Sequence, residues 1–415
     1  DWPLTYRMPT GEELLRAPLG YYLPAALAGK LGGVAVAQAA LWAWTGLGLA
    51  LTFALLRSIV PGGGRKAFAI AATVFVVFGG LQFGVLFAWD ALRGLDPTAR
   101  WGASLEWWAG LFQYSGHMTL VLWVPNHVLP AWLTTLLLLR HARRAEFYAG
   151  AAAPLAAAAF WGPVSAAGAA VLYAVGWARL AGSAVDRAPA FRAVVSLRNL
   201  VAAPLLALPM AAYILSGAGS IPSGFLFHLR PAGMAAEHYA ALLLVGVLPW
   251  AILAALLLRS RFILAVTAML CLLPFYVFGP SDEMTMRGGI APLTVLAVAI
   301  GIALGLPEPT GAGSAAALRR GARGALAVCL VIAAAGALNE LSPVVLKPVW
   351  PLSRQCALPE AARQSVFRDA DWSHYFAHWP SSPLLDGWLA TPRQRLVETD
   401  DVGPCWPPDT GVSVP

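Results

Sequence analysis

The sequence predicts an all-α integral membrane protein, a bundle of many membrane-spanning helices. The chain has 415 residues, of which 59% are hydrophobic and only 12% are charged, whereas soluble domains carry about 25% charged residues. Several uncharged runs reach the length of about 20 residues that spans a bilayer as a helix. The alternation typical of a membrane β-barrel is absent. Because backbone groups in lipid must bond to one another, such long continuous runs favour helices.

The uncharged runs predict ten membrane crossings. The run over residues 147–178 is interrupted by the sequence FWGP, so we expect two shorter helices with a turn near Gly162 and Pro163. One further membrane helix is expected immediately before Asp1. The other eight crossings are expected at residues 34–56, 67–89, 118–139, 199–216, 239–258, 262–279, 288–306 and 324–339.

The charged residues divide between two sets of alternating loops. One set carries 15 basic and three acidic residues, and the rest of the chain carries 13 basic and 18 acidic residues. An excess of Lys and Arg marks the cytoplasmic side of a membrane, so both termini are expected outside. The net charge of +7 therefore needs no nucleic-acid partner. The basic residues of the cytoplasmic set are Arg57, Arg65, Lys66, Arg140, Arg143, Arg144, Arg179, Arg187, Arg192, Arg198, Arg259, Arg261, Arg319, Arg320 and Arg323.

Two regions are expected along the chain. Residues 1–341 form the transmembrane domain, and its first segment, 1–33, is expected to lie along the membrane surface as an amphipathic element. Residues 342–415 form an extracytoplasmic, proline-rich tail of loops and short helices. Its segment 371–379, with four aromatic residues and two histidines, is expected either to pack onto the outer loops or to bind an acceptor or rest on the membrane. Cys356 and Cys405 lie in this tail, on the side where disulfides persist, so we expect them to be bonded to each other.

The stretch FGPSDEMTMRGG, residues 278–289, places three charged residues between two uncharged runs. One interpretation is a solvated turn in which Asp282 caps the next helix and Arg287 extends to the interface. The other is an anion site, because the flanking glycines let a backbone approach a ligand and Arg287 lies beside a helix start. In this second interpretation Asp282 holds the guanidinium or orients the acceptor, and Glu283 faces solvent.

A second polar segment is YSGHMTLVLWVPNHVLPAW, residues 114–132. Its prolines indicate that the membrane span begins near Pro125, which places Asn126 and His127 at the outer mouth and His117 in the preceding loop. These side chains are either hydrogen-bonded within a proline-broken helix or functional, since polar groups at membrane depth are functional candidates. No second histidine stands at a matching depth to pair with His127 around haem or chlorophyll.

Together these segments resemble a known family. An acid after a first helix, then LGYYLPAALAGKL, WVPNHVLPAW and FGPSDEMTMRGGIAPL, resembles large bacterial membrane proteins of the GT-C glycosyltransferase type over residues 1 to about 340. The resemblance implies a sugar taken from a polyprenyl-phosphate carrier at the outer face of the bacterial inner membrane. It implies Asp1 as the general base or a metal-associated acid, Asp282 and Arg287 facing the donor phosphate, and Asn126 with His127 as a polar pair. The first loop lacks the Asp-x-Asp pair of the family.

Three functions are compatible with these observations. The first is the glycosyltransferase, with membrane lipid and a polyprenyl-phosphate sugar as partners. Its reaction either uses a divalent metal or does not, and the sequence assigns no residue as a metal ligand. The second is a non-enzymatic subunit of a larger membrane complex on the same scaffold. The third is a transporter of lipid or solute, which would carry ionisable residues at mid-depth and internal repeats. An enzyme requires Asp1, Asp282 and Arg287 to converge on one outer cavity, whereas a subunit does not.

Overall fold

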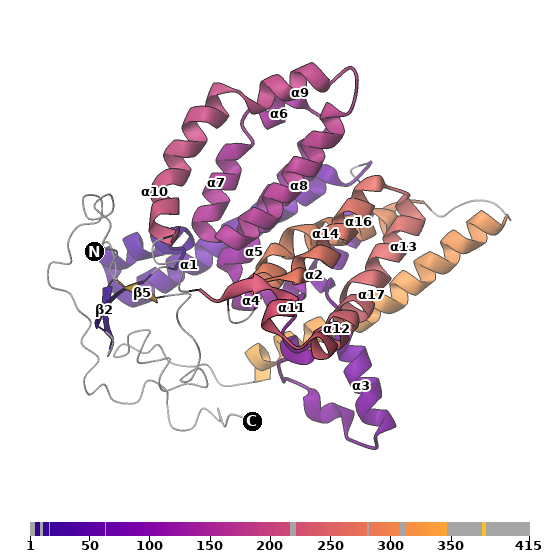
Figure 1. Cartoon of the computed structure of the whole chain (residues 1–415). Coiled ribbons are helices and arrows are strands. Elements are labelled where there is room, and N and C mark those ends of the chain that lie inside the picture. Colours follow the sequence, from indigo (N-terminus) through magenta and orange to yellow (C-terminus); the bar gives the residue numbers. More distant parts are fainter. Residues whose placement is uncertain are drawn as a thin grey trace.

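The chain folds mainly into α-helices (Figure 1). The computed structural model describes residues 5–8, 11–15, 17–62, 64–215, 221–279, 282–307, 313–346 and 376–378. The helices are α1 (Leu23–Ile59), α2 (Arg65–Val77), α3 (Gln82–Leu92), α4 (His117–Trp123), α5 (Pro125–His141), α6 (Ala145–Tyr148), α7 (Ala152–Trp161), α8 (Pro163–Ala181), α9 (Arg187–Val194), α10 (Ala203–Leu215), α11 (Leu226–Leu229), α12 (Ala232–Ala241), α13 (Leu248–Leu258), α14 (Arg261–Leu272), α15 (Glu283–Gly288), α16 (Ile290–Gly305) and α17 (Ser314–Leu346).

Within the described part of the chain, fewer helices are able to cross a membrane than the ten predicted. Five described segments have the necessary length and composition, or seven if each of two bent helix pairs counts as one span. The runs expected at 118–139 and 262–279 are interrupted at Pro125 and Pro274, and the run before Gly162 forms the short helix α7, so all three give shorter helices. The five are Gly20–Ile59, Pro163–Ala181, Ala232–Leu258, Glu283–Gly305 and Ser314–Leu346, and the bent pairs join α2 to α3 and the helix over Arg187–Val201 to α10.

The predicted break inside residues 147–178 is confirmed. Helix α7 ends at Trp161 and α8 begins at Pro163, with Gly162 in an extended conformation between them. Proline is well suited to the first position of a helix because its missing N–H has no partner there in any case. The local sequence therefore determines this turn.

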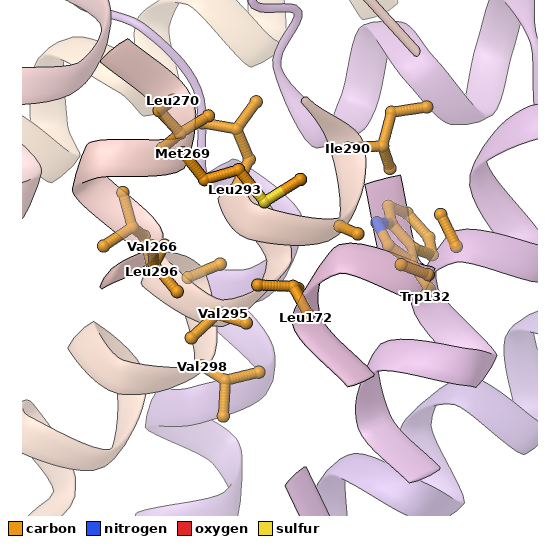
Figure 2. Packing of buried hydrophobic residues seen from close by; sticks show 14 of the residues in the cluster. Trp132, Leu172, Val266, Met269, Leu270, Ile290, Leu293, Val295, Leu296 and Val298 are labelled. Atoms are coloured by element: carbon orange, nitrogen blue, oxygen red, sulfur yellow. The ribbon is translucent and has the colours of Figure 1, made fainter. Parts of the chain in front are cut away.

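Helix α16 is the centre of the bundle. Helices α2, α5, α8, α13 and α14 all pack against it, and most of its residues are buried. Figure 2 shows Ile290 and Leu296 of this helix among apolar side chains from α5, α8 and α14, including Trp132 and Leu172. On the α2 side, a Cβ added at Gly301 would lie 2.9 Å from the Cα of Ala71, so the two backbones pack closely.

The two sets of loops lie at opposite ends of the helices. Among the basic loops, α6 packs on α9 (Figure 1), the Arg179 guanidinium lies 5.4 Å from the Phe262 ring centre, and Arg259 and Arg319 line one groove. Among the other loops, the Asn339 side chain accepts from the Gly102 N–H at 2.8 Å. The Tyr114 hydroxyl donates to the Leu270 carbonyl at 2.6 Å. At that end, the loop that contains Gly102 and Tyr114 is thus bonded to α17 and α14.

The N-terminal segment contains two strands before α1, and α1 itself bends at Gly33, where φ is 79°. Strands β1 (Thr5–Met8) and β2 (Gly11–Leu15) pair antiparallel, and β2 also pairs with β5 (Phe376–His378) of the tail, which was expected to lack strands. A second sheet pairs β3 (Ser223–Phe225) with β4 (Tyr276–Phe278). Each strand satisfies its backbone groups on a partner segment, and for β5 and for β4 that partner is distant in the chain.

Candidate functional site

Asp282 begins helix α15 and is fully buried. Its backbone is in the left-handed region, with φ of 47°. Asp is found in this region more often than most residues other than glycine. Its carboxylate accepts a hydrogen bond from the Thr285 N–H at 3.4 Å and another from the Thr285 hydroxyl. The interpretation of Asp282 as a helix cap is therefore confirmed.

Glu283 is buried rather than solvent-facing, which corrects the prediction. The residue is 4% exposed, and its carboxylate forms an ion pair with the Arg287 guanidinium, whose side chain is 12% exposed. The two residues stand four apart on α15, where side chains lie on the same face of a helix. The acid that pairs with Arg287 is thus Glu283, whereas Asp282 accepts the hydrogen bond from the backbone N–H of Thr285.

Helix α15 is seated directly on α8. A Cβ added at Gly168 of α8 would lie 2.2 Å from the carbonyl oxygen of Gly288, so only glycine permits this approach. The contact brings Arg287 near α5, close enough for its positive charge to act on the His127 ring. The site thus combines residues from three helices that are distant in the chain.

His127 and Asn126 lie at the start of α5, as predicted, and both are buried. The Nδ1 of His127 has no hydrogen-bond partner among the described residues. A Cβ added at Gly162 would lie 2.5 Å from this nitrogen, so the α7–α8 break leaves room for the imidazole. His127 is therefore placed beside Arg287 by the glycine that separates two other helices.

His117 lies in a different environment. Its ring centre is 4.5 Å from that of Phe75, 4.9 Å from Trp132 and 5.3 Å from Phe78. Its Nδ1 lies 2.7 Å from the Phe75 carbonyl oxygen, an acceptor, so Nδ1 carries the proton. His117 is the first residue of α4 and not part of a loop, because the chain becomes helical before Pro125. These contacts place it in the aromatic core between α2, α4 and α5, in agreement with the interpretation of an internally bonded side chain.

Tyr114 joins the site without having been predicted. Its ring lies against Gly289, where an added Cβ would be 2.5 Å from the tyrosine Cε1, and it interacts electrostatically with Asp282. Burial raises the pKa of Tyr114 well above its usual value, so the hydroxyl stays protonated and donates to the Leu270 carbonyl. The residues next to Tyr114 in the sequence do not indicate its contact with Gly289 and Asp282, which are distant in the chain.

The carboxyl group of Asp282 is held near its titration point at neutral pH. Burial raises the pKa of Asp282 to about 7, although hydrogen bonds from Thr285 act in the opposite direction and the charge of Glu283 adds to the rise. A carboxyl group with such a pKa exists in both protonation states near pH 7, which general acid–base chemistry requires.

A second buried polar cluster was missed altogether. Glu106 accepts a hydrogen bond from the Gln113 Nε2 at 2.6 Å, and its charge interacts with that of Glu340 near the end of α17. Both carboxylates line a cavity of about 20 Å³ at the break between α2 and α3, enough for a single water molecule. In the sequence, the only indication of this cluster was the position of Glu340, an acid directly after the span expected at 324–339.

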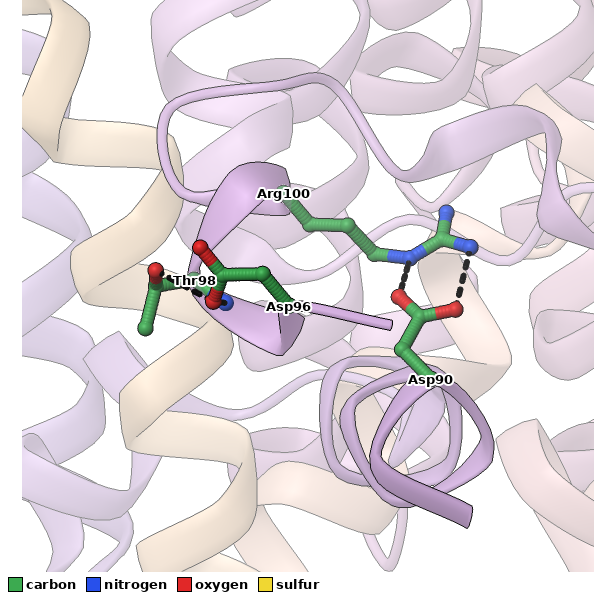
Figure 3. Close-up of polar contacts among 4 residues, drawn as sticks. All are labelled: Asp90, Asp96, Thr98 and Arg100. Atoms are coloured by element: carbon green, nitrogen blue, oxygen red, sulfur yellow. Dashed lines mark hydrogen bonds and ion pairs between the residues drawn. The ribbon is translucent and has the colours of Figure 1, made fainter. Parts of the chain in front are cut away.

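Figure 3 shows a separate ion pair at the C-terminal end of α3. Arg100 contacts the Asp90 carboxylate with two nitrogens, one of them at 3.0 Å, and Asp96 accepts from the Thr98 N–H at 2.9 Å. These contacts fold the loop after α3 back onto the helix. Their partners are all local, which indicates a structural role.

The remaining predictions concern a metal site and three residues of the two terminal segments. The described residues contain no group of three or more His, Cys, Asp or Glu able to hold a metal ion. Asp1, Cys356 and Cys405 lie outside the described residues. Comparison of the chain with protein-family models, with curated proteins and with solved structures finds no match.

Proposed function

We propose that this protein is a membrane glycosyltransferase that takes a sugar from a polyprenyl-phosphate donor at the outer face, with Arg287 as the phosphate-binding residue. The observation that carries the proposal is the placement of Arg287. Its side chain, which is 12% exposed, is paired with the buried Glu283 at the end of the bundle away from the basic loops, and its charge acts on His127.

Arginine suits the leaving group of such a reaction. As the bond from the sugar to the phosphate breaks, negative charge grows on the phosphate oxygens, and planar N–H donors stabilise it. The ion pair with Glu283 involves the Nε of Arg287. In the proposal the guanidinium donates to the phosphate oxygens of the donor. Glu283 keeps the guanidinium in one orientation, which lowers the entropy cost of binding.

The other groups have distinct parts in the proposal. Asp1, which matches the first-loop acid of the resembling family, is the base that takes the proton of the acceptor hydroxyl. Asp282 is a positioning residue, because it caps the short helix that carries Arg287. His127 and Asn126, at the start of α5, supply polar contacts to the sugar or its phosphate. The apolar surface of the helices accommodates the polyprenyl chain.

The test measures binding and transfer on the purified full-length chain in nanodiscs. Tritiated decaprenyl phosphate serves as the binding probe, and a decaprenyl-phosphate sugar as the donor for transfer or slow hydrolysis. Arg287→Ala is expected to weaken binding by about 1.5 to 3 kcal/mol, and Arg287→Lys to restore part of the binding and little of the transfer because the bidentate geometry is lost.

The matched control is Arg230→Ala, an exposed arginine in one of the loops of the same set. It removes the same charge outside the site and is expected to leave binding and transfer at wild-type levels. Wild-type protein that neither binds decaprenyl phosphate nor processes the donor would contradict the proposal and favour a non-enzymatic subunit. Equal loss in the Arg230 and Arg287 variants would show that only surface charge matters.

A further inference from the structure

A groove opens between α13 and α17 at the opposite end of the bundle, among the basic loops. Its volume is about 310 Å³, within the range of about 300–1,000 Å³ of small-molecule sites. Side chains on its walls face outward from the bundle: Ile252 is 55% exposed and Leu318 is 57% exposed. The described residues that line it are Ile252, Ala255, Leu256, Arg259, Ala315, Leu318 and Arg319.

The groove joins this apolar wall to two positive charges. Arg259 and Arg319 are the charged members of the lining, which contains no acidic residue among those described. The Nε of Arg319 is buried and has no hydrogen-bond partner within the described part of the chain. A buried guanidinium N–H without an acceptor is costly, so an anionic oxygen at this position would satisfy it.

Neighbouring arginines show the contrast. One turn further along α17, Arg323 donates to the carbonyl oxygens of Ala303 at 3.1 Å and Leu304 at 2.8 Å, so its guanidinium closes the end of α16. Arg259 ends α13 in a left-handed conformation with φ of 47°, which few residues other than glycine adopt. Arg323 therefore serves the fold, whereas Arg259 and Arg319 border the groove.

We propose that this groove binds one anionic phospholipid of the surrounding membrane. The apolar wall takes the upper part of an acyl chain, and the two guanidinium groups take the phosphate, a pairing that planar arginine donors favour. A zwitterionic lipid would bring its own cation against Arg259 and Arg319, so charge complementarity selects the anionic class. The bound lipid bridges α13 and α17. This proposal is independent of the glycosyltransferase reaction.

The experiment uses native mass spectrometry of the full-length chain with phosphatidylglycerol and with phosphatidylcholine of the same acyl chains. Wild-type protein is expected to retain one phosphatidylglycerol in preference to phosphatidylcholine. The double variant Arg259→Ala/Arg319→Ala is expected to lose affinity by roughly tenfold or more, from the attraction of two basic residues. The matched control, Arg143→Ala/Arg144→Ala, removes two exposed arginines from another loop of the basic set and is expected to retain the lipid.

A second variant separates the groove from its charge. Ala315→Trp fills the groove while both arginines remain, and it is expected to abolish lipid retention even if the arginine variant folds poorly. Equal binding of both lipids, unchanged binding in both groove variants, or equal loss in the control pair would overturn the proposal. Displacement of phosphatidylglycerol by millimolar inorganic phosphate, with Ala315→Trp binding normally, would show a site for free anions instead.

Discussion

The guanidinium of Arg287 is paired with the carboxylate of Glu283 one helical turn before it, and both side chains are largely buried at the start of the central helix α16. Glu283 therefore compensates the charge of Arg287, and α15 carries both members of the pair. This relationship makes Arg287 a fixed group, and it determines what substitutions in this segment do.

Removal of the charge from Glu283 tests the ion pair. Glu283→Gln keeps the shape of the side chain and leaves Arg287 without its carboxylate, so we expect a loss of unfolding free energy of about 3 kcal/mol. The measurement is thermal unfolding of the purified protein in one detergent. The control is Glu237→Gln, which changes an exposed acid within α12 and should unfold at the wild-type temperature. Equal melting temperatures for the two variants would show that the ion pair contributes nothing.

Asp282 predicts a pH dependence of stability. Burial raises the pKa of this carboxyl from 3.8 to about 7 in the folded chain. Between these values the folded state holds a proton that the unfolded state has lost, so the contribution to stability is complete below pH 4 and is lost as the pH rises through 7. Asp282→Asn mimics the protonated form and remains a good cap, even at positive φ.

The check is the melting temperature of both proteins at several values between pH 4 and pH 8. Wild type should lose stability with rising pH, and Asp282→Asn should show a flatter profile. Two parallel profiles would mean that Asp282 titrates in the folded chain as it does in water.

The α8–α15 contact predicts an asymmetric effect of glycine substitutions. Gly168→Ala would place its Cβ 2.2 Å from a backbone oxygen that cannot rotate away, so we expect a loss of about 1 to 3 kcal/mol from overpacking. Gly46→Ala, inside α1, meets nothing within 4 Å and should be neutral or stabilising by about 0.5 to 1 kcal/mol. Thermal unfolding compares them, and equal effects would show that α15 shifts easily on α8.

The Glu106–Glu340 pair predicts a stabilising substitution. Glu106→Gln removes one of two neighbouring negative charges and keeps an oxygen that accepts from Gln113. Because burial raises the pKa of Glu106, its charged form is the unfavourable one, so the variant should melt at a higher temperature than wild type at pH 8. The gain should shrink as the pH falls and the wild-type acid takes up its proton. A lower melting temperature at pH 8 would show that the charge is needed there.

The charge division of the loops predicts the orientation of the chain. A tag after Pro415 should be accessible from outside intact cells, because the loops with 15 basic and three acidic residues are assigned to the cytoplasm. In a variant whose four native cysteines are replaced, Arg143→Cys should react with a membrane-impermeant thiol reagent only after the membrane is opened. The reverse labelling pattern would invert the topology and move the Arg287 site to the cytoplasmic face.

The sequence by itself determined the features that depend on composition or on neighbouring residues. Long uncharged runs specify membrane helices because lipid offers no hydrogen bonds to the backbone. Gly162 with Pro163 specifies the break between α7 and α8, and Asp282 specifies the start of α15, because a turn or a cap is made by residues a few positions apart. Pro125 and Pro274 also shortened two expected spans, a local effect that apolar length alone does not show.

Only the tertiary structure decided the contacts between distant segments. Glu283 is turned inward because α15 packs on α8 through Gly168 and Gly288, so a residue that looks solvated in the sequence is buried. Strand β5 pairs with β2, and Glu106 meets Glu340, although no local pattern links either pair. Such contacts depend on how helices pack around α16, and packing is a property of the whole bundle that no single stretch of sequence contains.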